Sequence, residues 1–288
     1  KQTKLAAEIF DELYNKTFDG VGVTRASYGE GEQVASELLE SHAKELGLVI
    51  DHDAAGNIYM TMRGESQEAP PIVIGSHIDS VAQGGNFDGA AGVISGLIAC
   101  AGIIEKGIRL PQDIRVMGIR AEESAWFGVS YIGSRSALGT LPKDALDNAK
   151  RSDTGITLGE HMFKAGCNPD ALRAGDIYLP PSSLKAYLEV HIEQGPVLDS
   201  KDLPLGIVTG IRGNRRLPSA QCIGEYSHCG GVPRSYRKDA VLAVTDLVNY
   251  LDRVWDDCEN EGKDFAFTVG KFFTDKEWHA CLLYTSDA

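Results

Sequence analysis

The sequence predicts an α/β fold in which a mostly parallel β-sheet lies between layers of helices. Short apolar runs typical of buried strands alternate with longer stretches of helical periodicity along the first two thirds of the chain. Parallel strands are joined by such helical crossovers, and strands covered on both faces are almost continuously apolar. The 288 residues are also enough for two domains, each with its own core.

The same patterns assign the individual elements in chain order. Helices are expected where apolar residues recur every three or four positions, and Gly47 marks the end of the second one. In this first part we expect helices at 4–16, 31–46 and 93–106, and strands at 46–51, 57–64, 72–75, 114–119 and 185–191. Residues 144–181 show a weak pattern and are expected to be rich in loops. Further on, strands near 219–225 and at 265–270 flank an amphipathic helix at 238–257, which is half of a two-layer α/β module.

Charge and composition exclude several classes of partner. The chain carries 28 Lys and Arg against 41 Asp and Glu, a net charge of −13, without a dense basic stretch. We therefore expect neither nucleic acid nor an anionic membrane as a partner. The longest apolar run, 93–104, is much shorter than the roughly 20 residues of a membrane-spanning helix. Six cysteines without a C-x-x-C pair are typical of a reducing compartment, which predicts a cytoplasmic location.

Side chains that bind metals follow three of the predicted strands. Ligands of open α/β sheets gather at the carboxyl ends of strands, so residues there can meet in one crevice. The glycine-rich segment GGNFDG, which contains Asp88, can fold back over the same crevice. The residues at the strand ends are His77 with Asp79, Glu122 with Glu123, and His191 with Glu193.

Each of these residues alone also has a structural explanation. Asp88 can be the N-cap of the following helix, and a histidine at a strand end is commonly a satisfied polar residue. Glu122 and Glu123 can form a solvated strand edge. Together, the residues fit a two-metal hydrolase, which needs one carboxylate between the ions and a free carboxylate that takes a proton from water. In the His-x-Asp segment, Asp79 can fix the tautomer of His77 by accepting a hydrogen bond from its ring.

Four motifs resemble those of a known family. GSHIDSV (75–81), GGNFDGAAGV (84–93), RAEES (120–124) and HIEQGP (191–196) occur in the family's order and at similar spacing. From about residue 4 to residue 280 the chain resembles amidohydrolases of the M20 metallopeptidase superfamily. The branch is that of the hydantoinases and carbamoylases, which includes N-carbamoyl-L-amino acid and allantoate amidohydrolases. The resemblance implies a mixed, mostly parallel sheet between helices and an inserted two-layer α/β lid, here incomplete.

The resemblance also implies a role for each motif residue around two divalent ions, zinc or manganese. The implied first-ion ligands are His77, Asp88 and His191, the second-ion ligands are Asp88 and Glu123, Glu122 is the general base, Asp79 orients His77, and Gln194 contacts the substrate.

Two further candidates lie beyond these motifs. His228, in GEYSHCGGVP, resembles a histidine of the family's lid that reaches across a homodimer and stabilises the oxyanion formed on the neighbour's substrate. The family pattern there is closer to His-Ala-Gly, and a polar loop histidine is the alternative. Arg212, Arg215 and Arg216 can approach a substrate carboxylate, with Arg216 as the candidate, or can form a solvated basic loop.

By the resemblance, residues 1–211 are the metal-binding catalytic domain and 212–280 part of a lid and dimerisation domain. The tail 281–288, CLLYTSDA, resembles no member of the family and is expected to be non-native. Family members return after the lid to add strands and a last histidine ligand of the second ion. We therefore expect the 288-residue chain to be inactive or poorly folded and the whole protein to be the enzyme.

The expected reaction is metal-dependent hydrolysis of the C–N bond of a linear ureido or carbamoyl amide. The first candidate substrate is an N-carbamoyl-L-amino acid, which gives the L-amino acid, CO₂ and ammonia. Allantoate or another ureido acid is the alternative substrate. An alternative of another class is an inactive fragment that serves as a binding or dimerisation module. A homodimer formed through the lid is the expected assembly.

Overall fold

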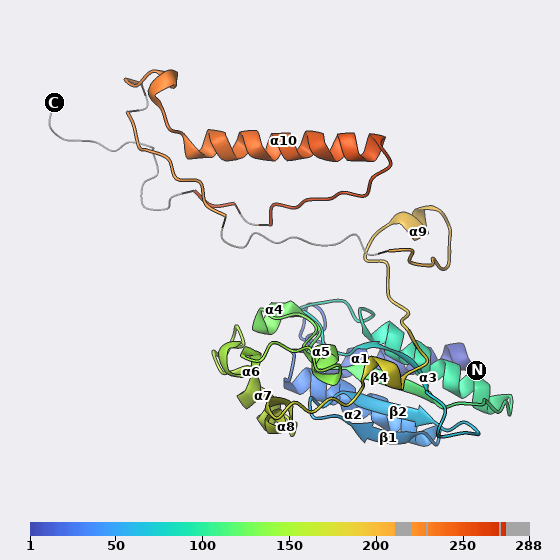
Figure 1. Ribbon diagram of the computed structural model, residues 1–288. Coiled ribbons are helices and arrows are strands. Elements are labelled where there is room, and N and C mark those ends of the chain that lie inside the picture. Colours follow the sequence, from blue (N-terminus) through green and yellow to red (C-terminus); the bar gives the residue numbers. More distant parts are fainter. Residues whose placement is uncertain (211–219, 229, 271, 275–288) are drawn as a thin grey trace. The chain divides into compact units, whose positions relative to one another are not determined.

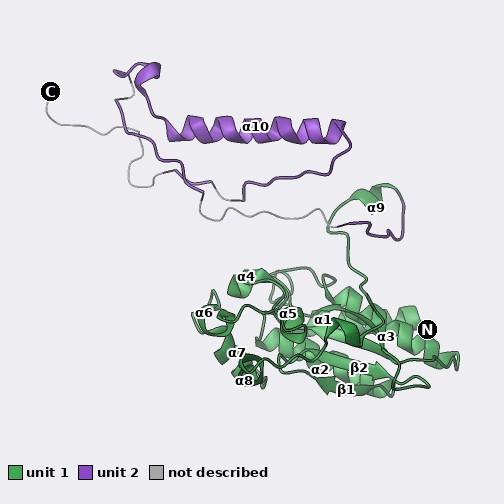
Figure 2. Ribbon diagram, in the orientation of Figure 1, with its two compact units in different colours: residues 1–201 green, residues 202–288 purple. Residues whose placement is uncertain are grey.

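The computed structural model describes residues 1–210, 220–228, 230–270 and 272–274. The chain forms two compact units, residues 1–201 and 202–288 (Figure 2). The domain division after residue 211 stays a prediction. The predicted non-native tail, 281–288, lies outside the described residues.

A five-stranded mixed sheet organises the first unit (Figure 1), which confirms the predicted α/β class. β3 lies parallel to both β4 and β5, whereas β2 is antiparallel to β1 and β4. The parallel part of the sheet therefore consists of β4, β3 and β5, side by side. The strands, in the order β1-β2-β4-β3-β5, are β1 (Val49–His52), β2 (Ile58–Met62), β4 (Ile114–Ile119), β3 (Ile72–His77) and β5 (Ala186–Leu188).

Two of the strands differ in how well the sequence predicts them. β4 has the predicted bounds, because its apolar run is buried on both faces of the sheet. The prediction of a strand over 185–191 is too long, since β5 spans only residues 186–188. Its one partner, β3, pairs with it only over residues 72–74. His191 consequently lies in the loop that follows the strand rather than in it.

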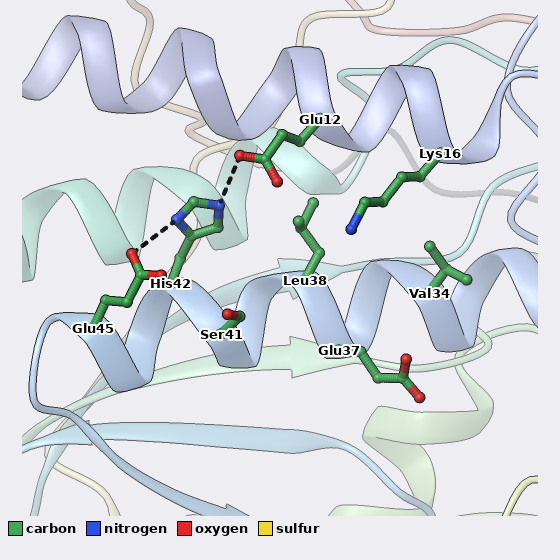
Figure 3. Close-up of a pocket in the computed structure, with 8 residues that line it drawn as sticks. All are labelled: Glu12, Lys16, Val34, Glu37, Leu38, Ser41, His42 and Glu45. Carbon is green, nitrogen blue, oxygen red and sulfur yellow. Dashed lines mark ion pairs between the residues drawn. The ribbon is translucent and has the colours of Figure 1, made fainter.

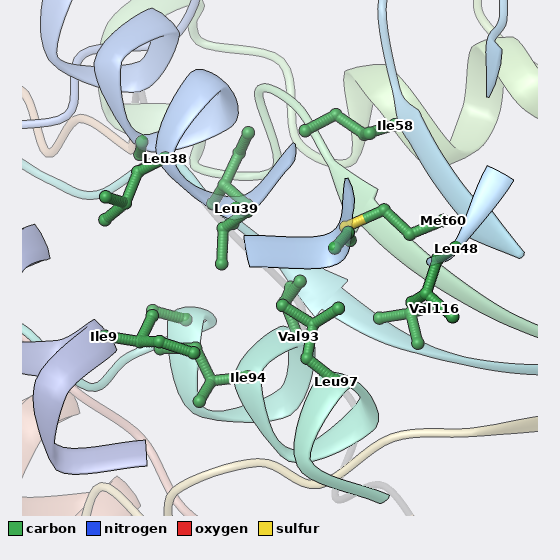
Figure 4. Packing of buried hydrophobic residues seen from close by; sticks show 14 of the residues in the cluster. Ile9, Leu38, Leu39, Leu48, Ile58, Met60, Val93, Ile94, Leu97 and Val116 are labelled. Atoms are coloured by element: carbon green, nitrogen blue, oxygen red, sulfur yellow. The ribbon is translucent and has the colours of Figure 1, made fainter. Parts of the chain in front are cut away.

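Three long helices cover one face of the sheet. Ile9 and Leu13 of α1 lie four residues apart, so both point inward. α3 is apolar almost throughout and packs against β3 and β4. Leu39 of α2 and Val116 of β4 are fully buried in the same core (Figure 4). The helices are α1 (Gln2–Thr17), α2 (Glu30–Glu45) and α3 (Ala90–Glu105), close to their predicted bounds.

The opposite face of the sheet has a smaller core. Tyr59, Val73 and Met117 alternate along their strands with the residues that face the long helices. They pack against Ala137 of α5 and against Leu179. Residues 144–181, expected to be loop-rich, contain several short helices. The remaining short helices of this unit are α4 (Ser124–Phe127), α5 (Ile132–Ala137), α6 (Ala145–Asn148), α7 (Leu158–Lys164), α8 (Pro169–Arg173), η1 (Pro181–Ser183) and α9 (Val197–Ser200).

The described residues of the second unit contain one long helix, α10 (Ala240–Asn260), and a short 3-10 helix, η2 (Arg234–Tyr236). α10 confirms the helix predicted at 238–257. The flanking strands are not found, because residues 220–225 and 265–270 form no ladder of backbone hydrogen bonds. A strand signal in the sequence is realised only where another strand pairs with it. Of the helices that the structure describes, none has the length and apolar character needed to cross a membrane.

Candidate metal centre

The sheet brings the predicted metal-binding residues to one edge. His77 is the last residue of β3, and Glu122 and Glu123 follow the neighbouring parallel strand β4. His191 follows β5, on the other side of β3. Asp88 lies in the loop between β3 and α3, just before that helix begins. The donors thus follow the carboxyl ends of the neighbouring strands β4, β3 and β5.

The first group of donors consists of His77, Asp88 and His191. The Oδ1 atom of Asp88 lies 3.7 Å from Nε2 of His77 and 3.5 Å from Nε2 of His191. This oxygen is buried and has no hydrogen-bond partner among the described residues. Two donors on one tetrahedral zinc ion, each at its usual distance, lie about 3.4 Å apart. The spacing and the unsatisfied oxygen therefore fit a metal ion better than they fit a hydrogen-bonded cluster.

A second group combines His77 with Glu122 and Glu123. Oε2 of Glu122 lies 4.0 Å from Nε2 of His77. The resemblance assigned Glu123 to a second ion together with Asp88, whereas the donors that converge here on Glu123 are Glu122 and His77. Carboxylate and imidazole donors of this kind suit zinc or manganese.

Asp79 connects the ends of β3 and β4. Its Oδ1 accepts a hydrogen bond from the backbone N–H of Glu122 at 2.9 Å, and its Oδ2 accepts one from the N–H of Glu123 at 3.1 Å. Oδ2 also accepts from the Ser27 hydroxyl at 2.7 Å. Nδ1 of His77 lies 3.0 Å from the backbone oxygen of Asp79 and 3.4 Å from its carboxylate. Asp79 thus holds the two glutamates by their backbone and lies beside the His77 ring.

Burial and neighbouring charges shift the pKa values of the side chains in this centre. Burial lowers the pKa of His77, but the contacts with Asp79 and Asp88 outweigh it and raise that pKa to about 11. Contact with His77 lowers the pKa of Asp88, whereas burial raises the pKa of Glu122 and that of Glu123. The carboxylates therefore favour a positive charge beside them. In the absence of a metal ion, the raised pKa favours a protonated His77 ring that supplies this charge. Because a ligand histidine must be neutral, an ion that binds here releases that proton.

The other candidates have different surroundings. Gln194 lies at the centre, where its Nε2 donates to Oδ2 of Asp88 at 2.5 Å. His228 belongs to the second unit, where its Nδ1 accepts from the N–H groups of Gly230 and Gly231. The candidate Arg216 lies outside the described residues.

The structure places a buried arginine, Arg25, at this centre. The predictions from the sequence do not include it. Arg25 is fully buried, and its Nε donates to the backbone oxygen of Ile78 at 2.7 Å. Its guanidinium also reaches the backbone oxygens of Asn86 and Asp88 at 3.5 and 3.4 Å. Arg25 therefore supports the loop that carries Asp88. The only signal in the sequence is an arginine between small residues in VTRAS, which equally describes an exposed turn.

Gly89 allows the Asp88 loop to approach the His77 ring. Its φ is +66°, and a Cβ atom at this position would lie 2.5 Å from atoms of that ring. We expect Gly89→Ala to displace His77 and to lower the affinity for Co²⁺ at least tenfold, as measured by visible absorption during titration. Gly85→Ala is the matched control, because a Cβ there meets nothing within 4 Å. Equal affinities of the two variants would contradict this expectation.

A shallow surface hollow lies elsewhere, between α1 and α2 (Figure 3). His42 is placed there between Glu12, at 3.6 Å, and Glu45, at 4.0 Å. None of the predicted site residues lines this hollow, which is formed by Glu12, Lys16, Val34, Glu37, Leu38, Ser41, His42 and Glu45.

Comparison with known proteins agrees with the geometry of the centre. Peptidase family M28 matches over residues 57–158, which contain four of the donor residues. The chain is 39% identical to an N-carbamoyl-L-amino acid amidohydrolase of Geobacillus stearothermophilus over 86% of its own length and 58% of that protein. It is 33% identical to a probable allantoate deiminase of Oryza sativa subsp. japonica, over 88% of its length and 51% of that protein.

Solved structures extend the likeness to the fold. A hydantoinase/carbamoylase family amidase from Burkholderia ambifaria superimposes with a TM-score of 0.71 and 30% identity. The match covers 88% of this chain and 61% of the amidase. The chain therefore spans little more than half the length of the relatives it matches. Sequence, fold and donor residues thus agree in their similarity to amidohydrolases of the hydantoinase/carbamoylase family.

Proposed function

We propose that the whole protein to which this chain belongs hydrolyses the C–N bond of a linear ureido or carbamoyl amide. The first candidate substrate is an N-carbamoyl-L-amino acid. The observation that carries the proposal is the group of His77, Asp88 and His191, in which a buried oxygen of Asp88 has no hydrogen-bond partner in the part of the chain that the structure describes. The relative named as an N-carbamoyl-L-amino acid amidohydrolase supports the choice of substrate.

Two divalent ions, zinc or manganese, are part of the proposal. His77, Asp88 and His191 would hold one of them. By the family resemblance, Glu123 with Asp88 would hold the other. Bound metal ions polarise the substrate carbonyl and lower the pKa of a coordinated water. Arg25 and Asp79 act from behind these ligands, because they fix the backbone that carries Asp88, Glu122 and Glu123.

Glu122 is the proposed general base. Its carboxylate takes a proton from the attacking water and delivers it to the leaving nitrogen, so that the amino acid leaves with a neutral amine. Burial raises the pKa of Glu122, which brings this carboxyl closer to the pH at which it works. Gln194 would contact the substrate from its place beside Asp88. His228 of a partner subunit would stabilise the developing oxyanion, in a homodimer formed through the lid.

Ammonia release tests the proposal. We expect the whole protein, loaded with zinc or manganese, to release ammonia from N-carbamoyl-L-amino acids, and we expect chelation to abolish and metal to restore the activity. The control is the N-carbamoyl-D-amino acid of the same side chain. Absence of hydrolysis with every substrate in the metal-loaded protein would favour the alternative of a binding or dimerisation module.

Allantoate is the second candidate substrate, because one relative is named a probable allantoate deiminase. A higher kcat/KM for allantoate than for any N-carbamoyl-L-amino acid would make it the preferred substrate. The cytoplasmic location stays a prediction from the cysteine pattern.

A further inference from the structure

A fully buried carboxylate, Glu32, lies in the first turn of α2. Its Oε1 accepts a hydrogen bond from the backbone N–H of Ala121 at 2.8 Å. Its Oε2 accepts from the N–H of Tyr28 and from Nε of Arg120, both at 2.7 Å. A buried charge requires such partners, and the amino end of a helix further stabilises a negative one. None of these contacts has a role in the reaction described above.

Both backbone donors belong to residues in a rare conformation. Tyr28 has a φ of +51° and Ala121 a φ of +52°, in the left-handed region that residues other than glycine seldom adopt. Such backbone strain persists only where the surroundings impose it, and it gathers at functional sites. Glu32 supplies an acceptor to both residues, so one side chain holds two left-handed positions.

Ala121 directly precedes the two glutamates of the metal centre. On one side of Ala121, the N–H of Arg120 donates to Oδ1 of Asn57 at 2.9 Å. On the other side, Asp79 accepts from the N–H groups of Glu122 and Glu123. The direction in which the chain leaves β4 between these anchors depends on the conformation of Ala121.

The Glu32–Arg120 ion pair also has an ordinary structural role, since both side chains are buried in one core region. Such a role would make Glu32 important for folding alone. The direct bond from Ala121 to Glu32 indicates a second role, because an ion pair alone does not require it.

We propose that Glu32 is a positioning residue, which fixes Ala121 in its left-handed conformation and thereby directs Glu122 and Glu123 into the metal centre. This inference rests on the proposed function, because it takes the glutamates as the residues that bind metal and move the proton. The known motifs place no role on Glu32, which lies in a helix far from them in the sequence.

The test uses Co²⁺ as the probe ion and the whole protein to which this chain belongs. Glu32→Gln keeps the size of the side chain but turns one acceptor into an NH₂ group that faces other donors. We expect the Co²⁺ affinity, from titration of the visible absorption, to fall about 10- to 100-fold, as when a metal ligand loses an outer partner. Ala121→Gly in the same background lets position 121 adopt a positive φ without steric strain. We expect this second change to recover part of the lost affinity.

Two further variants make the experiment decisive. Glu37→Gln, on the exposed side of the same helix, is the matched control and should bind Co²⁺ as the unchanged chain does. Glu32→Asp keeps the charge opposite Arg120 but is too short for all three donors, so it should lose affinity even where Glu32→Gln fails to fold. Circular dichroism reports folding of each variant.

The outcomes separate the inference from the proposed function. Folded Glu32 variants that bind Co²⁺ like the unchanged chain would overturn the inference alone. The inference alone would also be overturned if Glu32→Gln lowered the Co²⁺ affinity and the added Ala121→Gly recovered none of that loss. Glu32 would then act through the stability of the fold. A folded, unchanged whole protein that shows no Co²⁺ absorption would overturn the proposed function, and the inference with it.

Discussion

Glu122→Gln should lower kcat of the whole protein about 10²- to 10⁴-fold, the usual contribution of a general base. Glutamine has nearly the same shape as glutamate but takes no proton from water at neutral pH. The backbone N–H of residue 122 still donates to Asp79, so the loop should keep its conformation. We therefore expect little change in KM or in bound metal. Steady-state kinetics and metal analysis of the purified variant measure both quantities.

Glu123→Gln is the matched comparison, because it changes the neighbouring carboxylate in the same way. As a proposed metal ligand, Glu123 should lose bound metal when it is neutralised, and added metal should restore part of its activity. Added metal should leave Glu122→Gln inactive. If the two variants behave alike, or if Glu122→Gln retains normal turnover, the division of roles between the two glutamates is wrong.

Asp88→Asn should weaken Co²⁺ binding by the whole protein more than any other single change in the first donor group. The Asp88 carboxylate contacts both histidines, and its Oδ1 has no other partner among the described residues. Loss of an outer partner of a ligand costs about 10- to 100-fold in affinity, and loss of a charged ligand should exceed this. Calorimetric or spectroscopic titration measures the affinity.

Asp11→Asn, on the exposed side of α1, is the control for the loss of one negative charge. It should leave the affinity for Co²⁺ unchanged. An Asp88→Asn chain that binds Co²⁺ within a factor of ten of the unchanged chain would exclude Asp88 as a ligand.

Much of the first unit follows from local pattern, and its deviations have a common cause. The run at 114–119 is apolar enough to be buried from both sides, so it specifies β4 without reference to its neighbours. The alternation at 185–191 indicates a strand, but the length of the available partner decides how much of it forms. The segment at 265–270 lacks a strand partner in the described part of its unit. Within 144–181 the apolar periodicity is weak, but Thr157 and Glu160 form a capping box that indicates the start of α7.

The donor residues of the candidate site follow from motifs, whereas their supports do not. Each donor stands at a strand end or before a helix, where short segments of sequence identify it. Arg25 and Glu32 act through backbone atoms of segments far away in the chain. A bond to a backbone atom leaves no trace in the residue type of its partner. The left-handed Ala121 is equally invisible, because alanine carries no preference for that conformation.

The bonds that Asp79 accepts end on backbone N–H groups, which every residue except proline carries. The scaffold therefore determines where positions 122 and 123 lie without determining which side chains stand there. Chemistry and architecture are separable at this edge of the sheet. Both glutamates can therefore be exchanged for other metal-binding side chains while the hydrogen bonds from their backbone N–H groups to Asp79 are kept. This strand end could carry a different reaction on the same fold.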